Sequence, residues 1–171
     1  GETVRAFLQG QEGAPELELI VVDDGSSDQT PAILEEGSRQ WPSRFKVLRQ
    51  ENRGPAAARN RGLAAATGKL VLFTGDDIIP SAGFLREHWR MHALFTDDSV
   101  AVLGRVEWSA DQRVTPFMRW LERSGMQFNY HRIGDPADLP PEMFYTSNIS
   151  VKRGFISGVP ALFDEAIRTA S

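Results

Sequence analysis

The chain has 171 residues, of which 41% are hydrophobic and 25% are charged, and its formal net charge at pH 7 is −4. This balance is typical of one globular domain and excludes a largely disordered chain, a collagen-like chain and a coiled coil. The negative charge argues against nucleic acid as a main partner, and the absence of cysteine excludes disulfides, thiolate metal sites and cysteine nucleophiles.

Short apolar runs alternate with helical patterns through the first half of the chain. The runs at 17–22, 45–48 and 70–73 predict buried strands, because each is short and bounded by turn-forming or charged residues. Thr30-Pro31 and Gly54-Pro55 each predict the start of a helix, since proline is favoured in the first helical turn. The second of these helices is rich in alanine and is predicted to end near Ala66.

The second half of the chain carries weaker patterns. Residues 81–95 fit a helix with one apolar side, 100–108 a strand, 115–123 a short helix, 134–141 a turn-rich loop and 146–151 another strand. Strands that are separated by helices pair in parallel and carry helices on both faces of their sheet. We therefore predict an α/β domain with a mostly parallel sheet and helices on both faces.

Two of the predicted strands end in a pair of carboxylates. Asp23-Asp24 follows the first strand and Asp76-Asp77 follows the third. In an open α/β sheet, ligands bind beyond the carboxyl ends of the strands, and carboxylates gathered there need a cation or a donor-rich ligand. A plain turn with a helix cap is the alternative for Asp23-Asp24 alone. Both pairs together favour a site for Mg²⁺ or Mn²⁺ shared with phosphate oxygens.

Four segments in this order resemble family 2 glycosyltransferases, which are inverting enzymes with the GT-A (Rossmann-like) fold. They are Glu18–Asp28 (ELIVVDDGSSD), Asn52–Gly62 (NRGPAAARNRG), Gly68-Lys69 and Leu72–Asp77 (LFTGDD). Asn148–Arg153 and Phe163–Glu165 resemble acceptor-side elements of the same family. The resemblance implies a donor half that binds a nucleotide sugar, residues 1–108, and a truncated acceptor-side half, residues 109–171, of one GT-A domain.

The resemblance also implies a role for individual residues. Asp23 and Asp24 fall at the nucleotide-binding position, where Asp24 is implied to contact the base, and Arg59 falls near the nucleotide. Asp76 and Asp77 match the metal-binding DXD-like motif; Asp77, with Asp76, is implied to hold Mn²⁺ or Mg²⁺, and Asp76 to reach the ribose or the diphosphate. The implied reaction moves a sugar from a nucleotide-diphosphate sugar to a saccharide or lipid-linked acceptor, with inversion.

Three features depart from the family's pattern. Gly75 stands where the family often has an acid, so metal binding is expected to rest on Asp77 and Asp76. The family's first strand, which precedes the segment that starts at Thr3, is missing, and the family's catalytic-base motif follows the stretch matched by 163–165. We therefore interpret the chain as a fragment and assign no catalytic base. Asp164 and Glu165 are the available candidates, and a structural role is favoured for both.

Two other functions remain open from the sequence. One keeps the fold and makes the chain a nucleotide-sugar-binding domain that is inactive as a fragment. The other is a phospho-acceptor receiver module for signalling, which also has an acid pair after its first strand. In this chain, however, Asp76 follows Asp23 by 53 residues, which is longer than expected for that module, and the segment 52–62 has no role there.

His88 and His92 lie four residues apart on a predicted helix, at a spacing that suits a shared metal ion. No third ligand is visible, so packing or a polar contact at the helix surface is favoured. Four aromatic residues either stack on an acceptor sugar or pack in the core, which is the favoured interpretation. They are Trp108, Phe117, Trp120 and Phe128. For Arg119 and Arg123, contact with water is favoured over an anionic acceptor.

The cellular location is predicted from the absence of targeting signals. No apolar run approaches the roughly 20 residues of a membrane helix, and the first residues lack the pattern of a signal peptide. We predict a cytoplasmic protein. The resemblance adds a possible peripheral association at the inner face of the membrane, where envelope polysaccharides are built.

Overall fold

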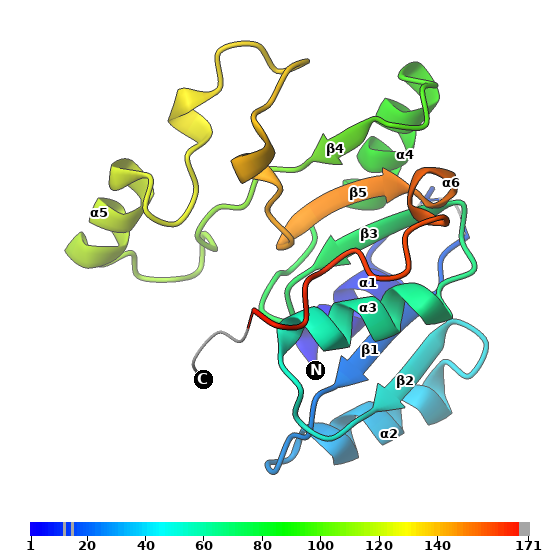
Figure 1. The fold of residues 1–171 in the computed structure, drawn as a ribbon. Helices are drawn as coiled ribbons and strands as arrows, with labels where there is room; N and C mark the ends of the chain where they lie inside the picture. Colours follow the sequence, from blue (N-terminus) through cyan, green and yellow to red (C-terminus); the bar gives the residue numbers. More distant parts are fainter. Residues whose placement is uncertain (12, 15, 168–171) are drawn as a thin grey trace.

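The computed structural model describes residues 1–11, 13–14 and 16–167 (Figure 1), so the last four residues of the predicted acceptor-side half lie outside the described residues. The elements follow in the order α1 (Glu2–Gln9), β1 (Leu19–Asp23), α2 (Thr30–Gln40), β2 (Phe45–Arg49), α3 (Pro55–Ala65), β3 (Leu70–Thr74), α4 (Phe84–Leu94), β4 (Ala101–Leu103), α5 (Pro116–Ser124), the 3₁₀ turns η1 (Tyr130–Arg132) and η2 (Pro141–Met143), β5 (Asn148–Lys152) and α6 (Arg153–Ile156). No helix in this part of the chain is long and apolar enough to cross a membrane.

The described strands form two sheets. β1 and β2 pair in parallel, with Leu19 opposite Phe45 and Asp23 opposite Arg49. The second sheet has the order β3-β5-β4, and β5 is antiparallel to both of its neighbours. The predicted parallel pairing is therefore correct for β1 and β2, whereas the strand predicted at 146–151, for which no direction was predicted, runs antiparallel to its neighbours. A long connection with no crossover helix against the sheet precedes β5, so nothing requires it to enter from the same end as β3.

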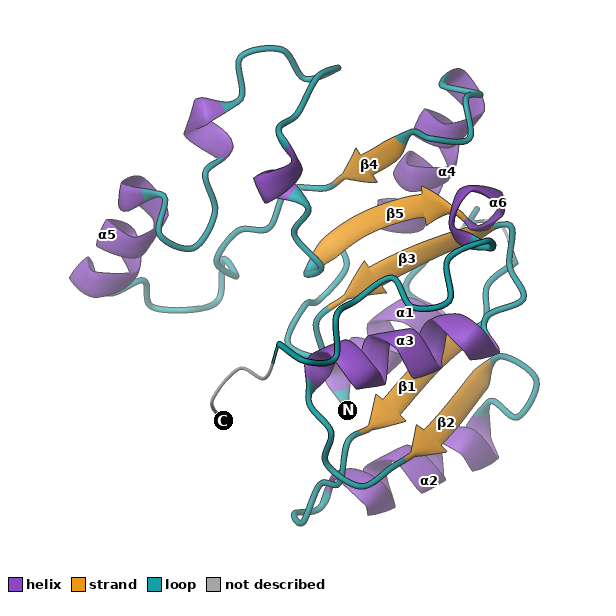
Figure 2. Ribbon diagram, viewed as in Figure 1, coloured by secondary structure: helices purple, strands orange, loops and turns teal. Residues whose placement is uncertain are grey.

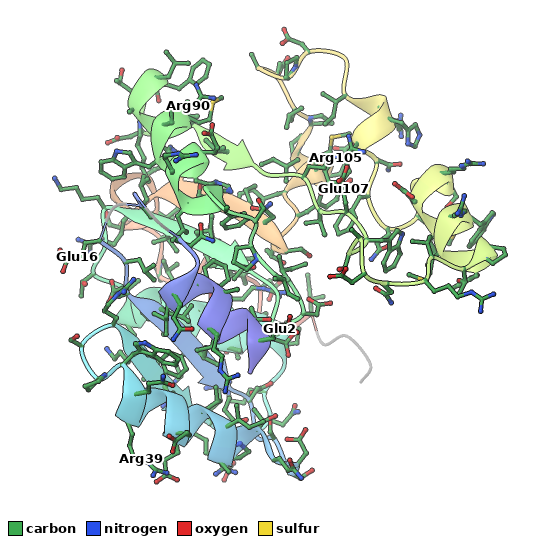
Figure 3. The ribbon with its side chains drawn as sticks, turned by 180° about the vertical axis from the view of Figure 1, so that it is seen from behind. Glu2, Glu16, Arg39, Arg90, Arg105 and Glu107 are labelled. Carbon is green, nitrogen blue, oxygen red and sulfur yellow. The ribbon has the colours of Figure 1, made fainter. Side chains whose placement is uncertain are left out.

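Helices cover both faces of the sheets, as predicted. α3 crosses in front of the strands in Figures 1 and 2, whereas α1, α2 and α4 lie in front when the molecule is turned in Figure 3. α3 lies over β1, where a Cβ added at Gly62 would be 3.4 Å from Val22 Cγ2. The Thr30 side chain does not cap α2; instead the Asp28 carboxylate accepts a hydrogen bond from Thr30 N at 2.9 Å.

The apolar core has two clusters, one for each sheet. Around β3 and β5 the buried residues are Val71, Phe73, Ile149, Val151 and Ile156. Around β1 and β2 they are Leu8, Leu34 and Phe45. Leu63 of α3 and Ala66, the residue that follows this helix, pack against the β3–β5 cluster, so α3 contacts both sheets.

β4 is shorter than the strand predicted at 100–108. It ends at Leu103, and the next residue, Gly104, donates its backbone N–H to Asn148 O at 2.9 Å. A Cβ at Gly104 would overlap the side-chain amide of Asn148, so this close approach requires glycine. The chain then leaves the sheet toward α5.

α5 stands apart from the two sheets (Figure 1) and buries none of its residues. Phe117 and Trp120 stack on each other with ring centroids 5.7 Å apart and remain 64% and 50% exposed, so the favoured core interpretation is wrong for both. Phe128 does pack, against the rings of Tyr130 and Tyr145. Arg119 and Arg123 are exposed, as predicted.

Candidate functional site

The carboxyl ends of β1, β2 and β3 point in the same direction in Figure 1, and the loops that follow them hold the predicted donor-site residues. The described contacts group these residues into three parts. One is the Asp23-Asp24 turn with the loop after β2, the second is the Asp76-Asp77 turn, and the third is the segment 163–165 against α3.

Asp23 is the last residue of β1, and its side chain is buried. Its Oδ1 accepts a hydrogen bond from Ser26 N at 2.8 Å, and its Oδ2 lies 3.3 Å from Arg49 Nε without a hydrogen bond. Hydrogen bonding with Ser26 holds the pKa of Asp23 below its usual value, and the charge of Arg49 contributes. The ionised carboxylate is thus neutralised by the opposite residue of the neighbouring strand.

Asp24 accepts three hydrogen bonds from the loop between β2 and α3. The donors are Gln50 Nε2 at 2.7 Å, Arg53 N at 2.9 Å and Gly54 N at 2.8 Å. Partial burial raises the pKa of this carboxyl group, but the hydrogen bonds outweigh it, so the pKa lies below its usual value. The carboxylate therefore fixes the chain at the residues that immediately precede α3.

Asp76 and Asp77 occupy an exposed turn directly after β3. The turn is closed by a hydrogen bond from Ile78 N to Gly75 O at 3.4 Å, and Thr3 Oγ1 donates to Asp76 O at 2.7 Å. In the described part of the chain, neither carboxylate has a hydrogen-bond donor or an ion-pair partner from the protein. These two carboxylates are therefore open to a ligand.

Gly75 has a local reason to lack a side chain. A Cβ at this position would lie 2.5 Å from Asp77 Oδ1 and 3.3 Å from Ile78 Cγ1. The carboxylate of Asp77 thus occupies the space into which a side chain at 75 would project. The glycine at position 75, where the family often has an acid, therefore leaves room for the side chain of Asp77.

Arg59, on α3, lies against the C-terminal segment. Its guanidinium carbon is 5.7 Å from the centre of the Phe163 ring, and burial lowers the pKa of this arginine. Phe163 also packs edge-to-face on Phe73 of β3, with centroids 5.2 Å apart. The described contact of Arg59 is with Phe163. That Arg59 lies near the nucleotide stays a prediction.

The two candidates for a catalytic base are both engaged by the protein. Glu165 Oε2 lies 2.8 Å from Arg53 Nη2, and its Oε1 accepts from Asn60 Nδ2 at 3.1 Å. Asp164 Oδ1 accepts from Ala166 N at 2.9 Å and so stabilises a turn. These contacts give both acids partners within the protein, and their role stays a prediction.

Sequence reasoning did not single out Asn60, Gln50 or Glu18. Asn60 clamps Phe163, donating to its carbonyl at 2.8 Å and accepting from its N–H at 3.0 Å. Glu18 Oε1 accepts hydrogen bonds from the backbone N–H groups of Thr67 and Gly68, at 2.6 and 2.8 Å. Asn60 and Glu18 lie inside the quoted motif segments, but their partners are about 50 to 100 residues away, and no local pattern reveals them.

The histidine pair and a cavity lie away from the carboxylate turns. His88 and His92 are buried and hydrogen-bond to β5, so the polar-contact interpretation is confirmed, although the contact lies inside the molecule. Among the residues that the structure describes, no group of three His, Cys, Asp or Glu residues is arranged to hold a metal ion. A cavity of about 370 Å³ lies at the start of β3 and the end of β5, away from the carboxylate turns. Leu70, Trp89 and Lys152 are among the residues that line it.

The chain matches the protein-family model described as glycosyl transferase family 2 over residues 1–155. It is 48% identical over 63 residues to the minor teichoic acid biosynthesis protein GgaA of Bacillus subtilis and 34% identical over 121 residues to the glycosyltransferase GlyA of Streptococcus pneumoniae. These alignments cover 36% and 70% of this chain but only 14% and 15% of the relatives. The chain thus spans a small part of the curated relatives that it matches.

A similar fold is found in the mannosyltransferase PcManGT of Pyrobaculum calidifontis, whose structure was solved in complex with GDP-Man and Mn²⁺. The TM-score is 0.68 at 24% sequence identity, and the match covers 97% of this chain and 44% of that protein. At this identity the likeness shows a shared fold, and it confirms the predicted α/β fold of the GT-A type.

Proposed function

This chain belongs to glycosyl transferase family 2, and from that premise we propose that it carries the donor site of an enzyme that transfers a sugar from a nucleotide-diphosphate sugar to an acceptor hydroxyl with inversion. In this proposal, residues 1–108 form the donor half and residues 109–171 belong to the acceptor-side half. The observation that carries the proposal is the turn after β3, where the exposed carboxylates of Asp76 and Asp77 have no partner among the described residues.

The same turn is the proposed metal site. Mn²⁺ and Mg²⁺ prefer oxygen ligands, and at nucleotide sites they are held by one or two carboxylates together with phosphate oxygens and water. Asp77 and Asp76 supply two carboxylates of this kind, and the donor's diphosphate supplies the remaining ligands. When bound, such an ion offsets the charge that builds on the diphosphate as it leaves the sugar.

The turn after β1 is proposed as the nucleotide side of the site. An ionised carboxylate has about four lone-pair positions, and Asp24 uses three of them on Gln50, Arg53 and Gly54. The fourth position is the one proposed to accept an N–H of the base. Asp23, buried beneath this turn, positions it through Ser26, and Arg59 is proposed to flank the nucleotide from α3.

The acceptor is proposed to be a saccharide or a lipid-linked saccharide. Support comes from the teichoic acid biosynthesis protein among the curated relatives. On the same ground we propose that the whole protein acts at the inner face of the membrane.

Family membership leaves no place for the receiver-module alternative, because the match runs through the whole of residues 1–155.

A second candidate function keeps donor binding without turnover by this chain. The observation that favours it is the engagement of both candidate bases, since Glu165 is held by Arg53 and Asn60 and Asp164 by its own turn. Transfer of sugar by a longer version of the protein, but not by this chain, would distinguish this candidate from the first.

Calorimetric titration tests the donor site directly. UDP, GDP and dTDP are titrated into the chain with and without Mn²⁺, and into the variants Asp77→Asn and Asp111→Asn. We expect Mn²⁺-dependent binding of one nucleotide, weakened about 10-fold or more in Asp77→Asn because a metal ligand is lost. Asp111 is exposed and lies in the loop before α5, so its variant is the matched control and should bind like the unchanged chain.

The opposite outcomes are equally clear. Absence of binding by a chain that circular dichroism shows to be folded would refute a donor site in these residues. Equal binding by Asp77→Asn and Asp111→Asn would remove Asp77 from the metal site while leaving nucleotide binding in place.

A further inference from the structure

A buried chain of polar side chains connects α4 to β5. His88, His92, Asn148 and Ser150 are each less than 7% exposed, in a region whose other buried residues are apolar. Ser150 Oγ lies 2.7 Å from His88 Nδ1 and 2.9 Å from His92 Nε2. His88 Nε2 lies 2.8 Å from Asn148 Oδ1. These contacts define one network, in which the ring nitrogen His92 Nδ1 is buried without a hydrogen-bond partner among the described residues.

The chemistry of the groups fixes the direction of every hydrogen bond. Asn148 Nδ2 donates to Arg105 O at 3.2 Å, so Asn148 Oδ1 is the acceptor for His88 Nε2–H. A neutral imidazole then has an unprotonated Nδ1, which accepts from Ser150 Oγ–H. Ser150 Oγ in turn accepts from His92 Nε2–H. Both histidines are thus assigned as neutral Nε2–H tautomers, and the network runs in one direction from His92 to Arg105.

The network ends at the point where the candidate donor site begins. Asn148 is the first residue of β5 and pairs with Thr74, the last residue of β3, after which the chain enters the turn of Asp76 and Asp77. Asn148 also binds the first residues after β4, through Arg105 O and through Gly104 N. Figure 3 labels Arg105 and shows it where the chain leaves the sheet. Asn148 therefore joins the end of β3 and the exit from β4 through its backbone, and His88 and Arg105 through its side-chain amide.

We propose that His88 is a positioning residue for the Asp76-Asp77 turn: by donating to Asn148, it holds the start of β5 against the end of β3 and so sets where the two carboxylates are presented. This inference rests on the proposed function, because it assigns His88 to the same donor site. His88 touches neither carboxylate and acts only through Asn148 and the β3–β5 pairing.

Protonation of His88 is incompatible with this arrangement. A second proton on Nδ1 would face the Ser150 hydroxyl hydrogen, so Ser150 would have to turn and leave the network. Burial lowers the pKa of both histidines. Repulsion between their protonated forms lowers the pKa of His88 further, and the charge of Lys152 lowers that of His92. The other charged groups that line the cavity beside His92 are Lys69, Asp98 and Arg153.

The sign of the pH dependence follows from the lowered pKa. The unfolded chain takes up these protons near pH 6.5, before the folded chain does, so protonation favours the unfolded state. The contribution of the network to stability is therefore fully present above this pH and is lost as the pH falls from there through the lower folded pKa values.

The experiment compares His88→Gln, His88→Leu and His131→Gln with the unchanged chain. The Gln side chain places an N–H donor where His88 Nε2 lies but does not titrate, whereas Leu offers no donor to Asn148. His131, exposed in η1, is the matched control. The probes are the backbone amide resonances of Gly75, Asp76 and Asp77 without ligand, and the affinity for GDP or UDP with Mn²⁺ between about pH 5 and 7.5.

We expect long-range ¹H–¹⁵N spectra to show the Nε2–H tautomer for His88 and His92 at neutral pH. His88→Leu should shift the amide resonances of 75–77 and weaken nucleotide binding about 10-fold or more, as loss of a supporting hydrogen bond does at metal sites. His88→Gln should restore both at neutral pH. The ratio of its affinity to that of the unchanged chain should rise as the pH falls through the folded pKa of His88, which burial holds below 6.5; this ratio cancels the titration of the nucleotide itself.

Several outcomes would overturn the inference. If His88→Leu lowers the melting temperature but leaves the 75–77 resonances and the affinity of the folded chain unchanged, His88 has a structural role alone. If His88→Leu does not fold, His88→Gln and the unchanged chain decide. The positioning role is refuted if His88→Gln, which keeps only the donor, has shifted 75–77 resonances at neutral pH, or if the affinity ratio stays constant while the long-range ¹H–¹⁵N spectra of the unchanged chain show His88 becoming protonated. If the unchanged chain binds no nucleotide, the proposed function fails, and the apo amide resonances still test whether His88 sets the turn.

Discussion

Among the single residues of the candidate site, Asp24 has the largest set of protein partners. It accepts hydrogen bonds from Gln50, Arg53 and Gly54, two of them from backbone N–H groups at the start of α3. These donors keep its pKa below the ordinary value of 3.8 despite partial burial. The charge at this position therefore stabilises the loop that would face a nucleotide.

Replacement of Asp24 by Asn should destabilise the fold by about 1.5 to 3 kcal/mol at pH 7, because hydrogen bonds to a charged acceptor are lost and an amide NH₂ faces a backbone N–H. The carboxylate's contribution is present above its unfolded pKa near 3.8 and is lost as the pH falls through the lower folded value. Urea denaturation at pH 7 measures the loss, and melting between about pH 3 and 7 measures its pH dependence.

The contrasting variant for Asp24 is Asp111→Asn, at an exposed carboxylate for which a change below about 0.5 kcal/mol is expected. The loss of stability between about pH 7 and pH 3 should be smaller in Asp24→Asn than in Asp111→Asn, because Asp24→Asn no longer has the carboxylate that is protonated. Equal urea midpoints for the two variants would mean that the three hydrogen bonds contribute nothing to the fold.

At the scale of elements, α3 organises the site more than any strand does. Asp24 holds the two residues that precede this helix, one side of the helix packs on β1 and on the β3–β5 cluster, and Asn60 binds the backbone of Phe163. The Phe163 ring then fills the space between Phe73 and Arg59. The segment 163–165, which carries the two candidate bases, is thereby attached to the same helix that faces the nucleotide turn.

Asn60→Ala should release this segment and cost about 1 to 3 kcal/mol, since two hydrogen bonds to the Phe163 backbone are lost. Glu165→Gln should cost less than about 1 kcal/mol, because the Arg53–Glu165 ion pair is exposed to water, with the two side chains 64% and 38% exposed. Urea denaturation of both variants, with hydrogen exchange at Phe163 N, measures the difference. A greater loss in Glu165→Gln than in Asn60→Ala would reverse the assignment of the clamp.

The elements also show which parts of the molecule a sequence can predict. The runs ending in Asp23 and Asp76, and the helix opened by Gly54-Pro55, carry their signals in adjacent residues, so β1, β3 and α3 were predicted nearly to their ends. The direction of β5 was not, because it depends on where a long connection returns to the sheet. The partners of Asp24, His88 and Asn60 lie about 30 to 100 residues away, and no local pattern encodes them.

At the scale of the whole molecule, the two sheets are separate hydrogen-bonded units in the described part of the chain. β1 and β2 surround one cluster of three buried residues, and β3, β5 and β4 surround another of five. α3 joins them, through Leu63 on one side and its contact with β1 on the other. A ligand at the shared carboxyl edge would touch both units, so donor binding should couple them.

Native-state hydrogen exchange tests this division. We expect the amides of Val21 and Val47 to open with a lower free energy than those of Phe73 and Ile149, because the first cluster buries less apolar surface. Leu63→Ala should weaken the packing of α3 on the β3–β5 cluster, lower the opening energy of Phe73 and Ile149 and so narrow the difference between the sheets, whereas Ala64→Ser on the exposed side of α3 should not. Under the proposed function, saturating nucleotide with Mn²⁺ raises both opening energies, since a ligand at 100 times its Kd adds about 2.7 kcal/mol. One common opening energy for all four amides, unchanged by Leu63→Ala, would show that the two sheets unfold as a single unit.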